Sequence, residues 1–208
     1  MKLTPWDVRK LLVALLISAL IQLTGRGQEA PDPKSNLLIN GDFAQGMTGW
    51  ELLSFGKQGQ ATVLQPKDVL LDSLKPPAVG QPAPDPTQIH NGKPSVMINN
   101  MDFDDTSVKQ KVTVKPGTRY RLSGWIKTKS VEAKKMNVKK PTGALLCIMG
   151  GFEGSESIVR TKEWVHVTYD FSSGTRSEIV IGARIGEYAT PVKGTAWFSE
   201  ISLVPIGH

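Results

Sequence analysis

The stretch "NLLINGDFAQGMTGW" (residues 36–50) joins a short apolar run to a turn and closes on Gly-Trp. The Asn-Gly-Asp at positions 40–42 consists of residues that tolerate the backbone angles of tight turns or bond to their own backbone. Phe43 and Trp50 follow, and buried aromatic side chains contribute large apolar areas to a core. The stretch therefore predicts a first strand over 37–39 and two aromatic anchors inside the fold.

Beyond this stretch, apolar and polar residues alternate over short segments that Gly, Pro, Asn or Asp separate, which is the period of a strand. Only residues 67–75 suggest one or two turns of helix. Many short strands without helices between them favour antiparallel sheets packed as a jelly-roll sandwich, so the predicted fold class is all-β. The further strands are expected at residues 50–55, 60–64, 95–99, 106–114, 118–128, 143–150, 163–171, 178–186 and 195–204.

Residues 65–93 interrupt this rhythm with six prolines. A loop of this length inside a compact domain is uncommon, and such loops are either functional or disordered. Both interpretations stay open from the sequence.

The first 27 residues have the layout of a secretory signal: cations, an apolar run over 11–23 and small residues before a cleavage point. The run is short for a membrane span, although an uncleaved signal anchor is the alternative. We predict a signal peptide over 1–27, a linker over 28–35 and one domain over 36–208. The mature protein is then secreted, or periplasmic at the cell envelope, with no stable membrane span.

Motifs for catalysis are missing. The three histidines have no metal-ligand spacing, and there is no nucleophile elbow, phosphate loop or dinucleotide fingerprint. The single cysteine, Cys147, lies in an apolar stretch and is expected to behave as a small buried hydrophobe. The sequence therefore predicts a protein that is not an enzyme.

Four stretches, in this order, resemble the carbohydrate-binding modules of families four, nine and twenty-two, which have a galactose-binding-like jelly-roll fold. They are "LLINGDFAQGMTGW" (37–50), "SVKQKVTVKPGTRYRLSGWIKT" (107–128), "EWVHVTYDFSSG" (163–174) and "TAWFSEISLV" (195–204). The resemblance implies non-catalytic binding of polysaccharide or glycan, and first and last strands that lie together. A structural or adhesion module of the cell envelope, binding protein through the same fold, is the alternative function.

Members of this group often bind a structural calcium through a glutamate after the first turn and an Asp-Asp pair entering the last strand. Here Ala44 stands at the first position, and Ser199 and Glu200 stand at the pair. Calcium prefers six to eight oxygen ligands. Asp42 and Glu200 remain as side-chain ligands, so we expect no required cofactor and little effect of removing calcium. The acidic stretch at 99–107 is interpreted as turn residues.

In "TRYRLSGWIKT" (118–128), the alternation places Tyr120 and Leu122 inward, and Arg121 and Trp125 outward. An outward indole is costly unless something covers it. Two interpretations stay open: the Pro-rich loop or a terminal segment packs over Trp125, or the indole stacks on a sugar ring while arginines bind its hydroxyls.

A second strand, in "SEIVIGARIGEYA" (177–189), offers matching chemistry, with glycines that leave room for a ligand. Arg184, Glu187 and Tyr188 are expected to line its edge. The predicted ligand site therefore comprises Trp125, Arg121, Arg184, Glu187 and Tyr188.

Between residues 109 and 140 there are eleven cations and one acid, Glu132. The cations either attract an acidic polysaccharide or protect strand edges from pairing. Nucleic acid is not expected as a partner, because the chain carries an export signal and no recognition motif.

Overall fold

The computed structural model describes residues 36–73, 86–134, 142–187 and 190–206. The predicted signal, the predicted linker and Tyr188 lie outside these residues. The elements in chain order are β1 (Glu51–Ser54), β2 (Gly59–Leu64), α2 (Pro66–Ser73), the 3₁₀ turn η1 (Pro86–Gln88), β3 (Ser95–Asp104), β4 (Thr106–Thr113), β5 (Arg119–Ala133), β6 (Ala144–Ile148), β7 (Glu153–Gly154), β8 (Arg160–Ser172), β9 (Glu178–Ile185) and β10 (Val192–Pro205).

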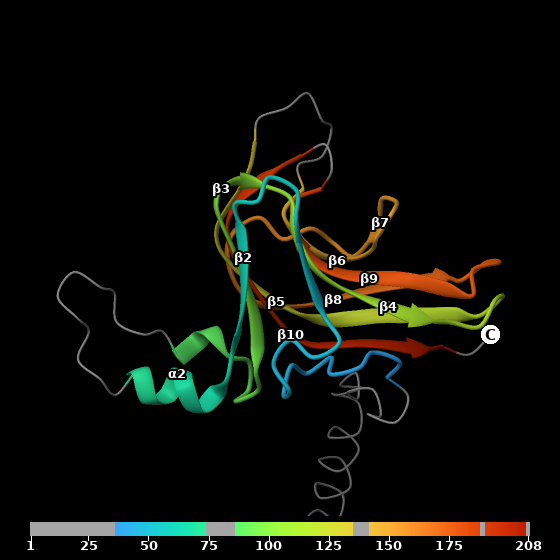
Figure 1. Cartoon of the computed structure of the whole chain (residues 1–208), viewed down its shortest axis with the longest axis horizontal. Helices are drawn as coiled ribbons and strands as arrows, with labels where there is room; N and C mark the ends of the chain where they lie inside the picture. Colours follow the sequence, from blue (N-terminus) through green and yellow to red (C-terminus); the bar gives the residue numbers. More distant parts are fainter. Residues whose placement is uncertain (1–35, 74–85, 135–141, 188–189, 207–208) are drawn as a thin grey trace, which may run out of the picture. The chain divides into compact units, whose positions relative to one another are not determined.

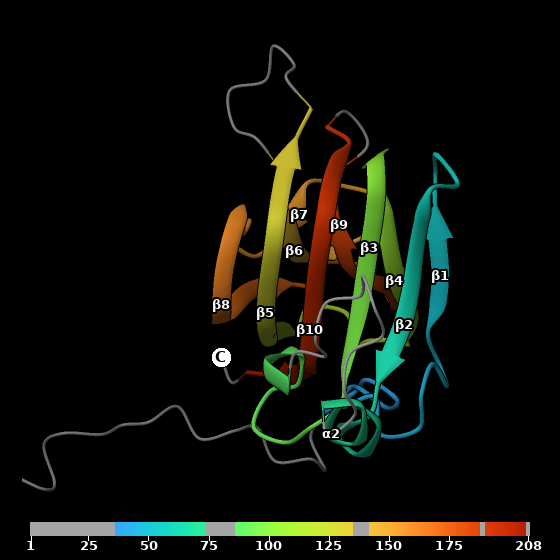
Figure 2. The ribbon, with the colours of Figure 1, turned by 90° about the vertical axis from the view of Figure 1, so that its left-hand side faces the viewer.

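Two antiparallel five-stranded sheets make up the fold. Sheet A has the order β1-β4-β9-β6-β7, and sheet B the order β2-β3-β10-β5-β8. Figure 1 shows the strands of both sheets, and Figure 2 looks onto sheet B. The predicted all-β sandwich is confirmed, and α2 accounts for the helical turns expected near residues 67–75. Within the described ranges, no helix combines the length and apolar character that crossing a membrane requires.

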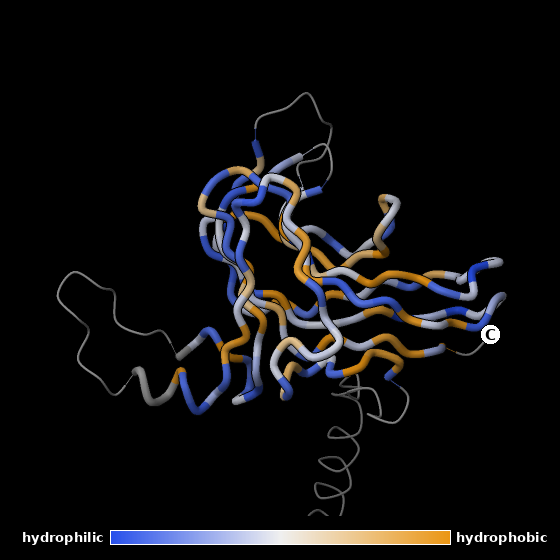
Figure 3. The backbone as a smooth tube through the Cα atoms, in the orientation of Figure 1, coloured by the Kyte–Doolittle hydropathy of each residue, from blue (hydrophilic) through white to orange (hydrophobic). Residues whose placement is uncertain are grey.

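The core lies between the sheets and follows the predicted alternation, visible as changing hydropathy along the strands in Figure 3. On β5, Tyr120, Leu122 and Ile126 point inward and are buried. On β9, Ile181 and Ile185 do the same. Residues between these positions therefore face outward, on one of two outer faces.

The predicted strand over 37–39 is wrong, because this segment forms no ladder. Two side-chain amides and one backbone hydrogen bond, from the Leu37 N–H to the Leu203 carbonyl, hold the segment instead. The Gln110 amide accepts a hydrogen bond from the Ile39 N–H at 2.7 Å and donates one to its carbonyl at 2.8 Å. The Asn36 amide donates to the Ile201 carbonyl and accepts from the Leu203 N–H. The opening segment thus joins β4 of sheet A to β10 of sheet B.

The turn after this segment packs as the sequence predicts. Phe43 and Trp50 are both buried, with ring centroids 5.2 Å apart, and the Trp50 indole donates to the Asn40 carbonyl. A side chain at Gly41 would place its Cβ 2.1 Å from the Ile201 carbonyl oxygen, so only glycine fits there. The opening turn and the last strand therefore lie in direct contact.

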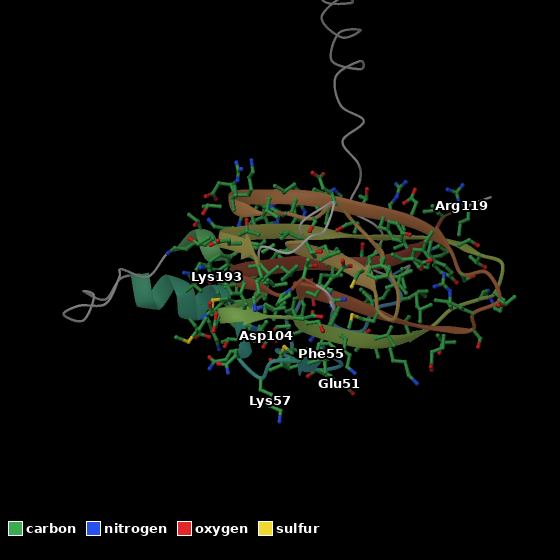
Figure 4. All side chains as sticks on the ribbon, turned by 90° about the horizontal axis from the view of Figure 1, so that it is seen from above. Glu51, Phe55, Lys57, Asp104, Arg119 and Lys193 are labelled. Carbon is green, nitrogen blue, oxygen red and sulfur yellow. The ribbon has the colours of Figure 1, made fainter. Side chains whose placement is uncertain are left out.

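A single carboxylate holds the connection between β1 and β2. Asp104, at the end of β3, accepts hydrogen bonds from the Ser54 hydroxyl and from the N–H groups of Gly56, Gln58 and Gly59 at 2.6–3.0 Å. Figure 4 shows Asp104 beside Phe55 of this connection. Burial raises the pKa of Asp104, but these hydrogen bonds lower it by more, so the pKa lies below its ordinary value. The carboxylate thus connects an edge strand of sheet A to sheet B.

Candidate functional site on the outer faces

The outer face of sheet A is built from the residues that alternate with the core. Glu51, Lys109, Gly182 and Cys147 are register partners across four strands, so they form one row. Arg184 lies in the neighbouring row, opposite Ser107. Charged side chains on β1, β4 and β9 thereby come together on one face.

A hollow of about 160 Å³ opens at this face. Its lining contains three charged side chains, one amide and one apolar side chain, together with the backbone of the opening turn. These residues are Gly49, Glu51, Lys109, Gln110, Lys111 and Val180. The hollow is small, and both polar and apolar groups line it.

The lysines of the hollow are matched with acids. The Lys109 ammonium lies 3.5 Å from the Glu51 carboxylate, and the Lys111 ammonium lies 2.8 Å from the Glu178 carboxylate. The hydrogen bond from Lys111 to Glu178 raises the pKa of Lys111. The face therefore presents alternating charges without a large net charge.

Arg184 is the most buried charged group on this face, with 5% of its surface exposed. Its Nη2 donates to both oxygens of Asp105, at 2.5 Å each. Among the described residues its Nε has no hydrogen-bond partner, and the remaining guanidinium contacts are to sulfur, a weak acceptor: the Met149 sulfur lies 4.0 Å from Nη1, and the Cys147 thiol also interacts with the guanidinium. Asp105 thus orients a guanidinium whose other donors lack a strong acceptor.

This ion pair is costly to bury. Desolvation raises the pKa of Asp105 even though Arg184 donates to it. A buried pair of this kind often contributes no more stability than apolar residues of similar volume. A contribution to the stability of the fold therefore does not by itself explain why Arg184 and Asp105 are buried at this position.

The glycine in mid-strand does not leave room for a ligand, contrary to the sequence prediction. A Cβ on Gly182 would lie 2.7 Å from the Met149 sulfur and 3.2 Å from the Cys147 sulfur. Met149 and Cys147 thus fill this space. Burial raises the pKa of the Cys147 thiol to about 11, and the thiol is buried as predicted.

Glu187 follows β9 at the end nearest Arg184. It accepts a hydrogen bond from the Thr142 hydroxyl at 3.1 Å and forms an isolated bridge with Thr190. Arg184 and Glu187 therefore both belong to the sheet A side of the molecule.

Trp125 and Arg121 lie elsewhere, on the outer face of sheet B. The sequence analysis grouped them with Arg184 in one site, and the structure separates them because β5 and β9 belong to different sheets. Arg121 makes a bidentate ion pair with Asp170 at 2.7 Å. Their role in binding a ligand stays a prediction, but they do not share a face with Arg184.

The end of the Pro-rich loop packs over Trp125, which is the first of the two interpretations that the sequence left open. The His90 ring stacks on the Trp125 indole with centroids 4.2 Å apart. His166 contacts the same indole at 5.0 Å, and its own pKa is lowered by burial. The indole is half-buried and already has aromatic neighbours from its own chain.

The two residues considered for calcium are engaged differently. Glu200 binds Lys93 and His90, the latter at 2.7 Å, and Asp42 accepts a hydrogen bond from the Ala44 N–H. Among the described residues, no group of three or more His, Cys, Asp or Glu side chains is arranged to hold a metal ion. Glu200 would have to release its cations to bind calcium, so its fit is poor, and the calcium expectation stays a prediction.

Sequence reasoning missed Asp105, Glu51, Lys109 and His90. Asp105 was within the acidic stretch interpreted as a turn, and only its pairing with Arg184, 79 residues later, gives it another role. His90 was placed only in the Pro-rich loop; the Asn-Gly pair that follows it is a strong turn signal, but it does not identify what the turn contacts.

Comparisons with known proteins agree with the fold. No family sequence profile matches the chain, and no curated protein has a matching sequence. A carbohydrate-binding module of family 61, solved in complex with β-1,4-galactotriose, superposes with a TM-score of 0.52 at 18% identity, covering 82% of this chain and 99% of that one. The enzymatically active domain of bacteriophage CBA120 tailspike protein 4 gives 0.52 at 12% identity, covering 84% of this chain and 22% of that one. The chain thus has the β-sandwich jelly-roll fold of carbohydrate-binding modules, as the resemblance implied.

Proposed function

We propose that this protein is an exported, non-catalytic module that binds carbohydrate on the outer face of sheet A. The fold is that of the galactotriose-bound module of family 61, which makes carbohydrate binding the leading function for a face with suitable chemistry. Fold alone does not assign function, so the proposal depends on the site itself.

The observation that carries the proposal is the guanidinium of Arg184. It is buried and held by Asp105, and within the part of the chain that the structure describes its other donors find no oxygen acceptor. Buried donors usually find acceptors, and an exception asks for an explanation. Glu51 and Lys109 bind sugar hydroxyls at the hollow, and a hydroxyl accepts from the Arg184 donors where the Met149 and Cys147 side chains that cover them move aside.

The charges of this face favour a neutral sugar over an acidic one. Its cations Lys109, Lys111 and Arg184 are each matched by a carboxylate. An anionic ligand would compete with these carboxylates, whereas hydroxyl groups both donate and accept. We expect binding to change less than about twofold when NaCl rises from 50 to 500 mM, since no net charge is neutralised.

A glycan array tests the proposal on the mature chain. Wild type is expected to bind a set of neutral glycans, and a variant with Glu51→Ala and Lys109→Ala to lose most of that signal. The matched control removes an exposed ion pair from the other sheet, through Lys193→Ala and Glu132→Ala, and keeps the signal. Equal loss in both double variants, or no glycan bound by wild type, contradicts the proposal.

Export is tested by sequencing the N-terminus of the protein recovered outside the cytoplasm. We expect removal of about the first 27 residues. Recovery of intact Met1 in a membrane fraction would favour the uncleaved anchor instead.

A further inference from the structure

The outer face of sheet B carries three of the five tryptophans of the chain: Trp125 on β5, Trp164 on β8 and Trp197 on β10. Trp197 points away from the core, because its neighbours Ala196 and Phe198 belong to the core, yet only 4% of its surface is exposed. This face is therefore aromatic and covered.

Residues 86–94, here called the strap, pack over Trp125 and contact Trp164. The strap begins with η1 and continues into a tight turn in which Asn91 and Gly92 have positive φ and the Lys93 N–H donates to the His90 carbonyl. Figure 2 shows η1 in front of β5 and β10. The turn presents His90 to the sheet, where its ring stacks on Trp125 and lies 5.2 Å from Trp164.

Polar contacts hold the strap at both ends. Thr87 at one end accepts from the Lys127 ammonium through its hydroxyl at 2.5 Å, and from the Trp164 indole through its carbonyl at 3.0 Å. At the other end, Glu200 binds both Lys93 and His90. Glu200 sits at a bulge of β10 with φ of +52°, a conformation that is unfavourable for a residue with a side chain.

The strap contacts this face through three groups. The His90 ring stacks on the Trp125 indole, the Thr87 hydroxyl accepts a hydrogen bond from the Lys127 ammonium, and the Thr87 carbonyl accepts one from the Trp164 indole N–H. A pyranose ring offers the same groups: an apolar face for stacking and oxygens that accept from ammonium and indole donors. In addition, the buried Nε1 of Trp197 has no hydrogen-bond partner among the residues that the structure describes, although indole N–H groups usually find one when buried.

We propose that the outer face of sheet B is a second carbohydrate-binding surface, and that the strap occupies it as an internal competitor. Glycan binding there requires the strap to leave Trp125, so the intact protein binds weakly at this face. The proposal concerns a different sheet from Arg184 and does not depend on the sheet A site.

The test uses an array of neutral oligosaccharides and the mature chain with His90→Ala. Removing the imidazole uncovers Trp125 without altering the sheet, so we expect at least one glycan signal to rise fivefold or more over wild type. Adding Trp125→Ala in the same chain must abolish the rise. Adding Glu51→Ala and Lys109→Ala, which disables the sheet A site, must leave it in place.

Lys93→Met provides a second opening variant, since it removes a cation from Glu200 and leaves no cavity against the indole. It reports on the strap if His90→Ala does not fold, as judged by thermal unfolding. A rise that survives Trp125→Ala, or no rise in any folded opening variant, overturns the proposal. If wild type binds no glycan but the opening variants still gain a signal that depends on Trp125, only the proposed site on sheet A is contradicted.

Discussion

The two outer faces of the sandwich differ in what covers them. The face of sheet A carries charges that are matched pairwise, and it opens into a hollow beside Glu51 and Lys109. The face of sheet B carries the aromatic side chains, and a segment between β2 and β3 packs across Trp125. The richer aromatic surface is thus the one that the chain itself occupies.

This difference shows that the alternation along a strand decides which side chains point outward, but not which of them stay accessible to a ligand. Alternation along β5 and β9 decides that Trp125 and Arg184 point outward. Availability is decided by loops: Met149 fills the space over Gly182, and the strap covers Trp125. An aromatic residue on an outward face therefore does not by itself mark a binding platform.

The largest expected effect concerns Cys147, which faces outward from sheet A but is buried. With its pKa raised to about 11, about one thiol in a thousand is ionised at pH 8, against about one in ten for an unfolded chain. Alkylation by iodoacetamide at pH 8 should thus be at least about 100-fold slower in the native protein than in urea. Similar rates would show that this part of the sheet A face is open.

The next effect concerns the connection between β1, the strand that carries Glu51, and β2. Asp104→Asn replaces a carboxylate that accepts several hydrogen bonds, so we expect a loss of about 2 kcal/mol in the free energy of unfolding. Asp102→Asn, an exposed change on the same strand, is the matched control and should cost less than about 0.5 kcal/mol. Urea unfolding of both variants measures the difference, and equal values contradict the role of Asp104.

The pH dependence of the same carboxylate has a defined sign. Because the folded pKa of Asp104 is lowered, its stabilising contribution is present at neutral pH and is lost as pH falls through that lowered pKa. Asp104→Asn should therefore reduce the steepness with which stability falls below about pH 4. If the free energy of unfolding falls equally steeply with pH in the variant and in wild type, other carboxyl groups cause the loss of stability in acid.

The smallest effect concerns calcium. Because Lys93 and His90 already bind Glu200, a chelator should shift the melting temperature by on the order of 1 °C or less. A large drop would mean that backbone oxygens and Asp42 hold a metal that displaces these cations.

The sequence predicts the sandwich and the direction of most side chains because both depend on local period. Tyr120, Leu122 and Ile181 face the core as their alternation requires. The strand predicted over residues 37–39 is wrong, because hydrogen bonds from the side-chain amides of Asn36 and Gln110 hold this segment where a strand ladder was expected.

The candidate site was less accessible to sequence reasoning because its contacts are distant along the chain. Asp105 and Arg184 are 79 residues apart, and His90 and Glu200 are 110 apart. No local pattern indicates such pairs. The sequence did identify Arg184 and Trp125 as outward residues, but the assignment of β5 and β9 to different sheets was needed to separate them.

Calorimetry with the best neutral glycan from the array tests the central claim most directly, using Arg184→Lys and Trp125→Leu after thermal unfolding confirms that both fold. Arg184→Lys keeps a cation for Asp105 but removes the unpartnered guanidinium donors, so affinity should fall at least about tenfold, or about 1.4 kcal/mol. Trp125→Leu, under the strap, should leave affinity within about twofold of wild type. Unchanged binding by Arg184→Lys together with lost binding by Trp125→Leu would contradict the account and place the carbohydrate on sheet B.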